Sequence, residues 1–174
     1  MSLEARLKQV IRDVPDFPKK GILFKDITPL LGDGKVFDQT IEALASSAGN
    51  GRIDLVAAVE SRGFIFGSAV AQRLSAGFVP VRKPGKLPSA TLRETYELEY
   101  GTDALEIHKD AVRAGQRVLL VDDLLATGGT ARAASSLIRR LGGEVAGVSF
   151  VIELAFLNGR SRLEGLNVTR LVTF

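Results

Sequence analysis

The sequence predicts an α/β fold with a mostly parallel central sheet that is flanked by helices. Two observations support this prediction. Short, continuously apolar runs, which suit strands covered on both faces, alternate with longer segments whose apolar residues recur at helical spacing. The chain has 174 residues, and a single domain is the simplest organisation for that length.

The amino-terminal quarter begins with a helix, because apolar residues recur at helical spacing over 3–12 and Pro15 and Pro18 then end the pattern. A compact apolar piece at 21–31 carries further helix breakers. Residues 35–48 again place apolar side chains on one side and predict a second helix.

The remaining segments complete the alternation of strands and helices. The expected strands are 53–59, 78–81, 117–121, 145–152 and 168–174, and the expected helices are 64–74, 129–141 and a short one at 158–163. Residues 82–95 differ, because they are strongly basic, contain Pro and Gly, and lack a core-forming period. We predict a mobile loop there and an extended return arm at 95–100.

The composition excludes several classes of site. The chain has no cysteine and one histidine, His108, which we expect at the surface. Disulfides, zinc thiolate sites and cysteine nucleophiles are therefore excluded, and any divalent ion needs oxygen ligands. The net charge of +3 comes from scattered residues, with two Tyr and no Trp to stack bases, so we expect an anionic small molecule and no nucleic acid.

No membrane or secretory signal is expected. No apolar run approaches the ~20 residues of a membrane span, and the amino-terminal residues carry acids and bases at helical spacing. We therefore expect no membrane partner and a cytoplasmic location.

Residues 118–130 read Val-Leu-Leu-Val-Asp-Asp-Leu-Leu-Ala-Thr-Gly-Gly-Thr, which predicts a buried strand, a loop and a helix start. Ligands bind at such carboxyl ends in open α/β sheets. The backbone N–H groups of the turn at 126–130 suit a phosphate. Asp122 and Asp123 would repel a bare phosphate, but they suit a ligand with hydroxyls and a divalent cation, such as a ribose phosphate. The alternative is a tight turn in which Thr127 caps the helix.

This string resembles the signature of the type I phosphoribosyltransferases, which bind 5-phosphoribosyl 1-pyrophosphate (PRPP). Segments in the same order along nearly the whole chain resemble the adenine phosphoribosyltransferase family: Phe17-Pro18, 21–29, 60–64, 82–88 and 98–101. The resemblance implies a type I phosphoribosyltransferase fold in a single domain, 1–174, with a small hood at 1–32 and a core at 33–174.

The resemblance also implies an activity. A pentosyltransferase of purine salvage would convert adenine and PRPP to AMP and pyrophosphate, as a homodimer. Mg²⁺ would be held through the substrate phosphates, with no direct protein ligand.

Roles for individual residues follow from the resemblance. The ribose phosphate is assigned to Asp122, Asp123, Ala126, Thr127, Gly128, Gly129 and Thr130, and pyrophosphate to Ser61, Arg62, Arg82, Lys83 and Lys86. Adenine is assigned to the main chain of Leu23 and Lys25, with the ring of Phe24 stacked on the base. Glu99 is the candidate that accepts the N9 proton of adenine or stabilises the altered ring, and Tyr100 steadies a lid formed by 82–95. Arg82 is expected to serve a neighbouring subunit.

Several alternatives stay open at this level. Phe24 suits a core position, Arg62 suits a salt bridge with Glu60 or another acid, and the basic loop suits a solvated excursion. Lys25 stands where the family often has Arg, which matters little if only its backbone reads the base. A transferase for a 6-oxopurine and a non-catalytic regulator that binds PRPP or RNA are the alternative functions.

Overall fold

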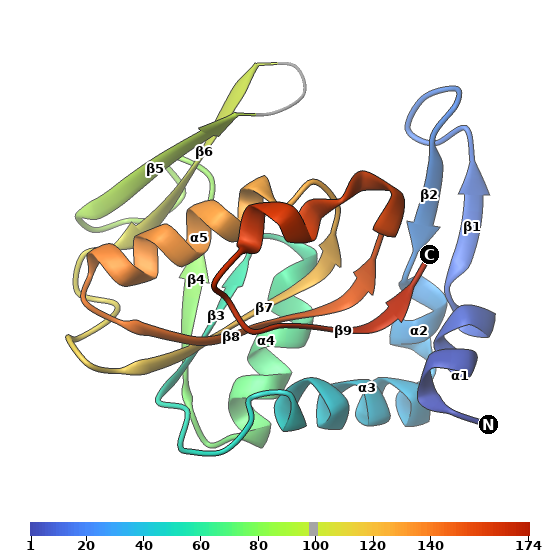
Figure 1. Ribbon diagram of the computed structural model, residues 1–174, viewed down its shortest axis with the longest axis horizontal. Coiled ribbons are helices and arrows are strands. Elements are labelled where there is room, and N and C mark those ends of the chain that lie inside the picture. Colours follow the sequence, from blue (N-terminus) through green and yellow to red (C-terminus); the bar gives the residue numbers. More distant parts are fainter. Residues whose placement is uncertain (98–100) are drawn as a thin grey trace.

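A five-stranded parallel sheet forms the centre of the molecule (Figure 1). The structure, a computed structural model, describes residues 1–97 and 101–174. The strand order is β4-β3-β7-β8-β9. The strands are β3 (Leu55–Val59), β4 (Gly77–Val81), β7 (Arg117–Leu125), β8 (Glu144–Glu153) and β9 (Val168–Thr173). All four neighbouring pairs are parallel, which confirms the predicted sheet.

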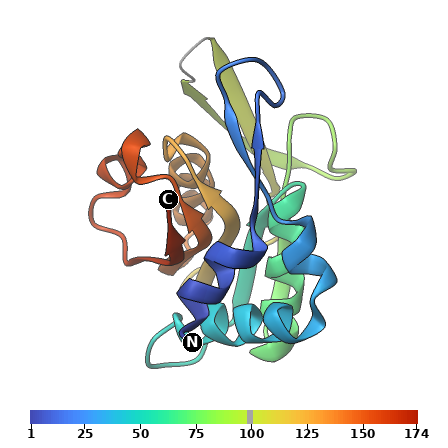
Figure 2. The same cartoon turned by 90° about the vertical axis from the view of Figure 1, so that its right-hand side faces the viewer.

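Two apolar layers cover the sheet, one on each face (Figure 2). Alternate residues of β7 contribute to them, because Leu119 and Val121 belong to one cluster and Val118 and Leu120 to the other. The first layer comes from α1 (Leu3–Val10), α2 (Thr28–Gly32), α3 (Gly34–Ser46) and α4 (Arg62–Arg73). The second comes from α5 (Gly129–Arg140), β5 (Thr91–Glu97), β6 (Thr102–His108) and the 3₁₀ segment η2 (Gly159–Leu163).

The strand order determines where a ligand can bind. From β3 the chain passes to β4 on one side and later returns to β7 on the other side. The loops that follow β3 and β7 therefore leave the sheet side by side at its carboxyl edge, and such a reversal of strand order opens a crevice for ligands. Among the described residues, no helix has both the length and the apolar character needed to cross a membrane.

An amino-terminal hairpin was not predicted. β1 (Arg12–Pro15) and β2 (Leu23–Asp26) pair antiparallel, with Val14 opposite Phe24. Figure 1 shows this hairpin extending beyond the helices beside the sheet. Each strand has only four residues, which is too short for an alternating pattern to be recognised in the sequence.

A second hairpin shortens the expected basic loop. β5 begins at Thr91, inside the predicted loop 82–95, and pairs antiparallel with β6, which was not predicted. Leu92 and Ile107 face each other in the register and pack onto the second apolar layer. His108, expected at the surface, is half-buried, and its Nε2 accepts a hydrogen bond from Ser89 N at 3.3 Å. The return arm is a strand as far as Glu97, and 98–100 lie outside the described residues.

Candidate active site

A cavity of about 440 Å³ lies where the loops after β3 and β7 meet. Its lining residues are Val59, Glu60, Ser61, Arg62, Lys83, Asp122, Asp123, Leu124, Leu125, Ala126, Thr127, Gly128, Thr130, Ala131 and Phe150. Residues assigned to ribose phosphate and to pyrophosphate thus line the same cavity, although they come from three separate stretches of sequence. The lining residues that were not assigned to the site from the sequence are Val59, Glu60, Leu124, Leu125, Ala131 and Phe150.

The turn between β7 and α5 is open for an anion. Gly128 precedes the helix with φ +83°, and no side chain caps the first N–H groups of α5. The expected alternative, a cap by Thr127, is therefore not found. A Cβ at Gly128 would lie 2.3 Å from the carbonyl oxygen of Gly159, so only glycine fits this position. Uncapped N–H groups and the helix dipole favour negative charge at this helix start.

Asp122 and Asp123 lie side by side under the cavity. Asp122 Oδ1 accepts a hydrogen bond from Asp123 N at 2.9 Å, and Asp123 is 6% exposed. The start of α4 packs against Asp122, since a Cβ at Gly63 would meet its Oδ1 at 2.6 Å. Burial raises the pKa of both carboxyls, and the charge of Asp123 raises that of Asp122 further. Arg62 opposes the pKa rise of Asp123.

Arg62 joins the acids to the hood. Its Nε pairs with Asp123 Oδ2 at 2.6 Å, so the expected salt bridge exists, with Asp123 as the partner and inside the cavity. The Arg62 guanidinium also lies 5.3 Å from the ring centroid of Phe24, which is within cation–π range. Phe24 is half-buried and contacts Phe17 edge to face, with ring centroids 5.1 Å apart. The Glu60–Ser61 peptide bond that precedes Arg62 is cis.

The other hood residues assigned to adenine lie in the β1–β2 hairpin. Leu23 and Lys25 flank Phe24 in β2, opposite Pro15 and Asp13 of β1. The Lys25 ammonium pairs with Asp13 at 2.5 Å and lies 3.7 Å from the centroid of the Phe174 ring. Because its side chain is occupied there, only the main chain of Lys25 remains to meet a base.

The basic residues assigned to pyrophosphate separate into two groups. Lys83 lines the cavity, whereas Arg82 and Lys86 do not. Arg82 pairs with Glu60 at 3.4 Å and donates to the carbonyl oxygen of Lys86 at 3.3 Å, while the Lys86 side chain is exposed. Gly129 starts α5 behind the cavity wall rather than lining it.

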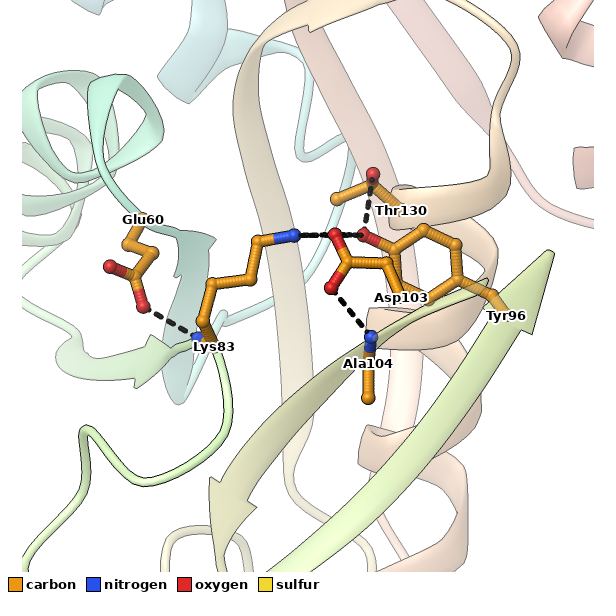
Figure 3. Close-up of polar contacts among 6 residues, drawn as sticks. All are labelled: Glu60, Lys83, Tyr96, Asp103, Ala104 and Thr130. Atoms are coloured by element: carbon orange, nitrogen blue, oxygen red, sulfur yellow. Dashed lines mark hydrogen bonds and ion pairs between the residues drawn. The ribbon is translucent and has the colours of Figure 1, made fainter. Parts of the chain in front are cut away.

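Lys83 is the centre of a polar network (Figure 3). Its ammonium donates to the Asp103 carboxylate and, at 3.3 Å, to the Tyr96 hydroxyl, and Thr130 Oγ1 donates to the same hydroxyl at 3.4 Å. Burial acts to lower the pKa of Lys83, but the hydrogen bonds to Asp103 and Tyr96 outweigh it and raise this pKa. Tyr96 and Asp103 face each other in the β5–β6 register, so recognition of that hairpin would have identified them as a pair.

Glu99 and Tyr100 lie outside the described residues. Within residues 1–97 and 101–174, no group of three or more His, Asp or Glu side chains is suited to hold a metal ion. The carboxylates of Asp122 and Asp123 are among the oxygen groups in the cavity lining that suit a hard cation.

The comparisons with known proteins agree with this geometry. The phosphoribosyl transferase domain model matches residues 33–164. An adenine phosphoribosyltransferase of Thermoanaerobacter pseudethanolicus is 59% identical over 174 residues, which is 100% of both chains. The chain belongs to the adenine phosphoribosyltransferase family.

Solved structures of family members have the same fold. The crystal structure of adenine phosphoribosyltransferase from Thermoanaerobacter pseudethanolicus has a TM-score of 0.95 at 58% identity, over 99% of this chain and 100% of that one. The Saccharomyces cerevisiae adenine phosphoribosyltransferase, solved with adenine and an imino-altritol bisphosphate, has a TM-score of 0.91 at 43% identity, over 97% and 98% of the two chains. The type I phosphoribosyltransferase fold that the sequence predicted is thereby confirmed.

Proposed function

We propose that this chain transfers the 5-phosphoribosyl group of PRPP to N9 of adenine, in purine salvage, and releases AMP and pyrophosphate. The observation that carries the proposal is the shared cavity: an uncapped helix start, two adjacent acids, Arg62 and Lys83 all border one space of about 440 Å³. A ribose that bears phosphate at one end and pyrophosphate at the other presents complementary groups to each of these features.

Different groups in the cavity bind different parts of the substrate. The turn at 126–130 takes the 5′-phosphate through backbone N–H groups, and the carboxylates of Asp122 and Asp123 accept hydrogen bonds from the ribose hydroxyls. Ser61, Arg62 and Lys83 take the pyrophosphate. As the bond between C1 and pyrophosphate breaks, positive charge develops on the ribose and negative charge on the leaving group, and fixed charges on both sides stabilise that separation.

The base binds on the hood side of Arg62. The ring of Phe24 stacks on the purine, and the main chain of Leu23 and Lys25 pairs with the amino group and ring nitrogen of adenine. A 6-oxopurine reverses the polarity of the exocyclic group and leaves those backbone groups unpaired. Glu99 accepts the N9 proton of adenine or stabilises the altered ring, and Tyr100 steadies the lid.

Mg²⁺ fits the cavity as a substrate-borne ion. Bound with the substrate, it would supply charge neutralisation to the departing pyrophosphate. Asp122 and Asp123 are the side chains placed to meet its coordinated waters or the hydroxyls beside it.

We also propose a homodimer, and a cytoplasmic location remains a prediction from the sequence. β4 is an edge strand, and Phe78 on it is 36% exposed. Phe64 packs edge to face on Phe78 at 5.7 Å, and the neighbouring Ile65 is 40% exposed. A second copy would cover this apolar face, and Arg82, at the end of the same strand, would lie near the partner's site.

A panel of bases tests the proposal. Purified protein is mixed with PRPP, Mg²⁺ and adenine, hypoxanthine, guanine or xanthine, and nucleotide and pyrophosphate are both quantified. We expect equal amounts of AMP and pyrophosphate with adenine and far less turnover with the 6-oxopurines. Preferred turnover of a 6-oxopurine would reassign the base, and PRPP binding without any product would indicate a regulator instead.

A further inference from the structure

Lys83 is held at both of its ends. Its backbone N–H donates to Glu60 Oε1 at 2.5 Å, which ties the residue to the loop after β3. Its ammonium donates to Asp103 and Tyr96 of the β5–β6 hairpin. Figure 3 shows the side chain extended between these two anchors. The hairpin, rather than solvent, therefore sets where the ammonium lies.

The Tyr96 hydroxyl uses its full bonding capacity in this network. It accepts hydrogen bonds from Lys83 at 3.3 Å and Thr130 at 3.4 Å, and it donates to Asp103 Oδ2 at 3.3 Å. A hydroxyl can donate one hydrogen bond and accept two, so all three of these bonds can form at the same time. Thr130 belongs to the first turn of α5 and lines the cavity. Tyr96 thus connects the phosphate turn to Lys83.

Asp103 stands in an unusual place for an acid, close to a cavity that takes phosphates. Its charge is matched by Lys83, and its Oδ1 also accepts the N–H of Ala104 at 2.7 Å. Burial acts to raise the pKa of Asp103, but these two partners outweigh it and lower that pKa, so the carboxylate stays charged. An ammonium has three N–H donors. Asp103 and Tyr96 take two of them, which leaves one for a phosphate oxygen.

We propose that Asp103 and Tyr96 are positioning residues that hold the Lys83 ammonium ready for the pyrophosphate group of PRPP. This inference rests on the proposed function. Neither residue lines the cavity, so each acts through Lys83. Their effect belongs to the pyrophosphate half of the site, because the adenine half is built on the other side of Arg62, at Phe24.

Asp103→Asn and Tyr96→Phe test the inference with almost no change in shape. Initial rates are measured with adenine and PRPP varied, and with AMP and pyrophosphate for the reverse reaction. We expect the KM for PRPP and for pyrophosphate to rise about tenfold, the loss typical of a hydrogen bond to a charged group, while the KM for adenine changes less than about twofold. In a Lys83→Ala background, Asp103→Asn adds nothing further, since its effect passes through Lys83.

Glu94→Gln is the matched control. It removes the ion pair of Glu94 with Arg140 at 2.6 Å, on the same hairpin, and leaves both KM values unchanged. An unchanged PRPP KM in Asp103→Asn and Tyr96→Phe overturns the inference. So does a lowered one, which would mean that Asp103 competes with pyrophosphate for Lys83.

Two further measurements test this inference even if one variant does not fold or if the proposed function fails. If thermal melting shows that Asp103→Asn does not fold, Tyr96→Phe decides alone. If the unaltered chain forms no AMP, the proposed function fails, and calorimetric binding of PRPP with Mg²⁺ to the unaltered chain and to Tyr96→Phe then decides whether the hairpin positions Lys83. Equal affinity of the two chains overturns the inference in that case.

Discussion

The two ends of the cavity are built in different ways. The turn at 126–130 is confined by backbone: Gly128 and Gly159 approach so closely that a Cβ on either would lie within 2.3 Å of a carbonyl oxygen. Lys83, at the end that we propose for pyrophosphate, is placed by hydrogen bonds and ion pairs between side chains that are partly exposed. The first arrangement suits a phosphate that stays in place throughout the reaction. The second suits a group that must be released, because side-chain contacts can be exchanged while packed backbone cannot.

Gly128→Ala is expected to have the largest effect on this comparison. The new Cβ would meet the Gly159 carbonyl oxygen at 2.3 Å, in a backbone conformation of φ +83°. We expect a loss of about 3 kcal/mol or more in the free energy of unfolding, and PRPP binding weakened at least about 100-fold, because strain and a backbone collision add. Denaturant unfolding and calorimetry measure the two effects.

Gly165→Ala is the control for backbone strain alone. Gly165 has φ +76° with no atom within 4 Å of its would-be Cβ. The Gly165→Ala variant is expected to lose only about 1–2 kcal/mol in the free energy of unfolding, the cost of a left-handed conformation, and to bind PRPP normally. Equal PRPP affinity in Gly128→Ala and Gly165→Ala would show that the close approach of backbone does not shape the phosphate site.

Glu99→Leu examines chemistry as opposed to binding. We expect kcat to fall about 100-fold, the lower range for a lost general acid or base, and PRPP affinity to stay within about twofold. Single-turnover rates and equilibrium binding separate the two quantities. Undiminished turnover would remove Glu99 from the reaction.

Asp123→Asn removes the partner of Arg62 while keeping the shape of the side chain. The KM for PRPP is expected to rise about 10–30-fold, because the hydroxyl acceptor and the ion pair at 2.6 Å are weakened together. An unchanged KM would count against the ribose-hydroxyl role.

The same variant has a pH signature. The folded pKa of Asp123 lies above the ordinary value of 3.8 because the carboxyl is buried. Ionisation therefore costs stability in the folded state, and that cost is absent below the unfolded pKa and grows as pH rises through the folded one. The melting temperature of Asp123→Asn relative to the unaltered chain should increase as the pH rises from about 4, at about 2–4 °C per kcal/mol. A constant difference across this range contradicts the burial effect.

Phe24→Leu has the smallest expected effect and tests the hood. The KM for adenine should rise about five- to tenfold, since base–aromatic stacking contributes about 1–3 kcal/mol and leucine retains part of the contact. The KM for PRPP should not change. Phe156→Leu, at a ring that is 77% exposed, is the matched control. If Phe24→Leu changes the KM for PRPP and not the KM for adenine, Phe24 does not stack on the base.

Much of the core fold was predictable, because most of the parallel strands are largely apolar runs and their helices carry one apolar side. The two hairpins were not. β1 and β2 are short, and the alternation of β5 and β6 is obscured because acids such as Glu94, Asp103 and Glu106 occupy half-buried positions. Hairpin strands such as Thr91–Glu97 are stabilised by contacts with their partner strand. The pattern of residues within one strand does not show which segment that partner is.

The site was predicted in the same uneven way. The string 118–130 indicated both the glycine turn and the acids, and Arg62 and Lys83 also line the cavity, while their role toward pyrophosphate stays a prediction. Lys86 does not line the cavity, because the sequence gives the charge of a loop residue but not the direction of its side chain, and its role toward pyrophosphate stays a prediction. Glu60 was considered only as a partner of Arg62, and it instead holds Arg82 and Lys83.

The sequence by itself determined the parallel strands, the glycine turn and the acids beside it, since these depend on neighbours within a few residues of one another. Only the tertiary structure decided which charges meet: Arg62 with Asp123 and the ring of Phe24, and Lys83 with Asp103 and Tyr96. The physical reason is that such pairs join segments far apart along the chain. Their partners are selected by strand order and hairpin register, which the packing of the whole molecule sets.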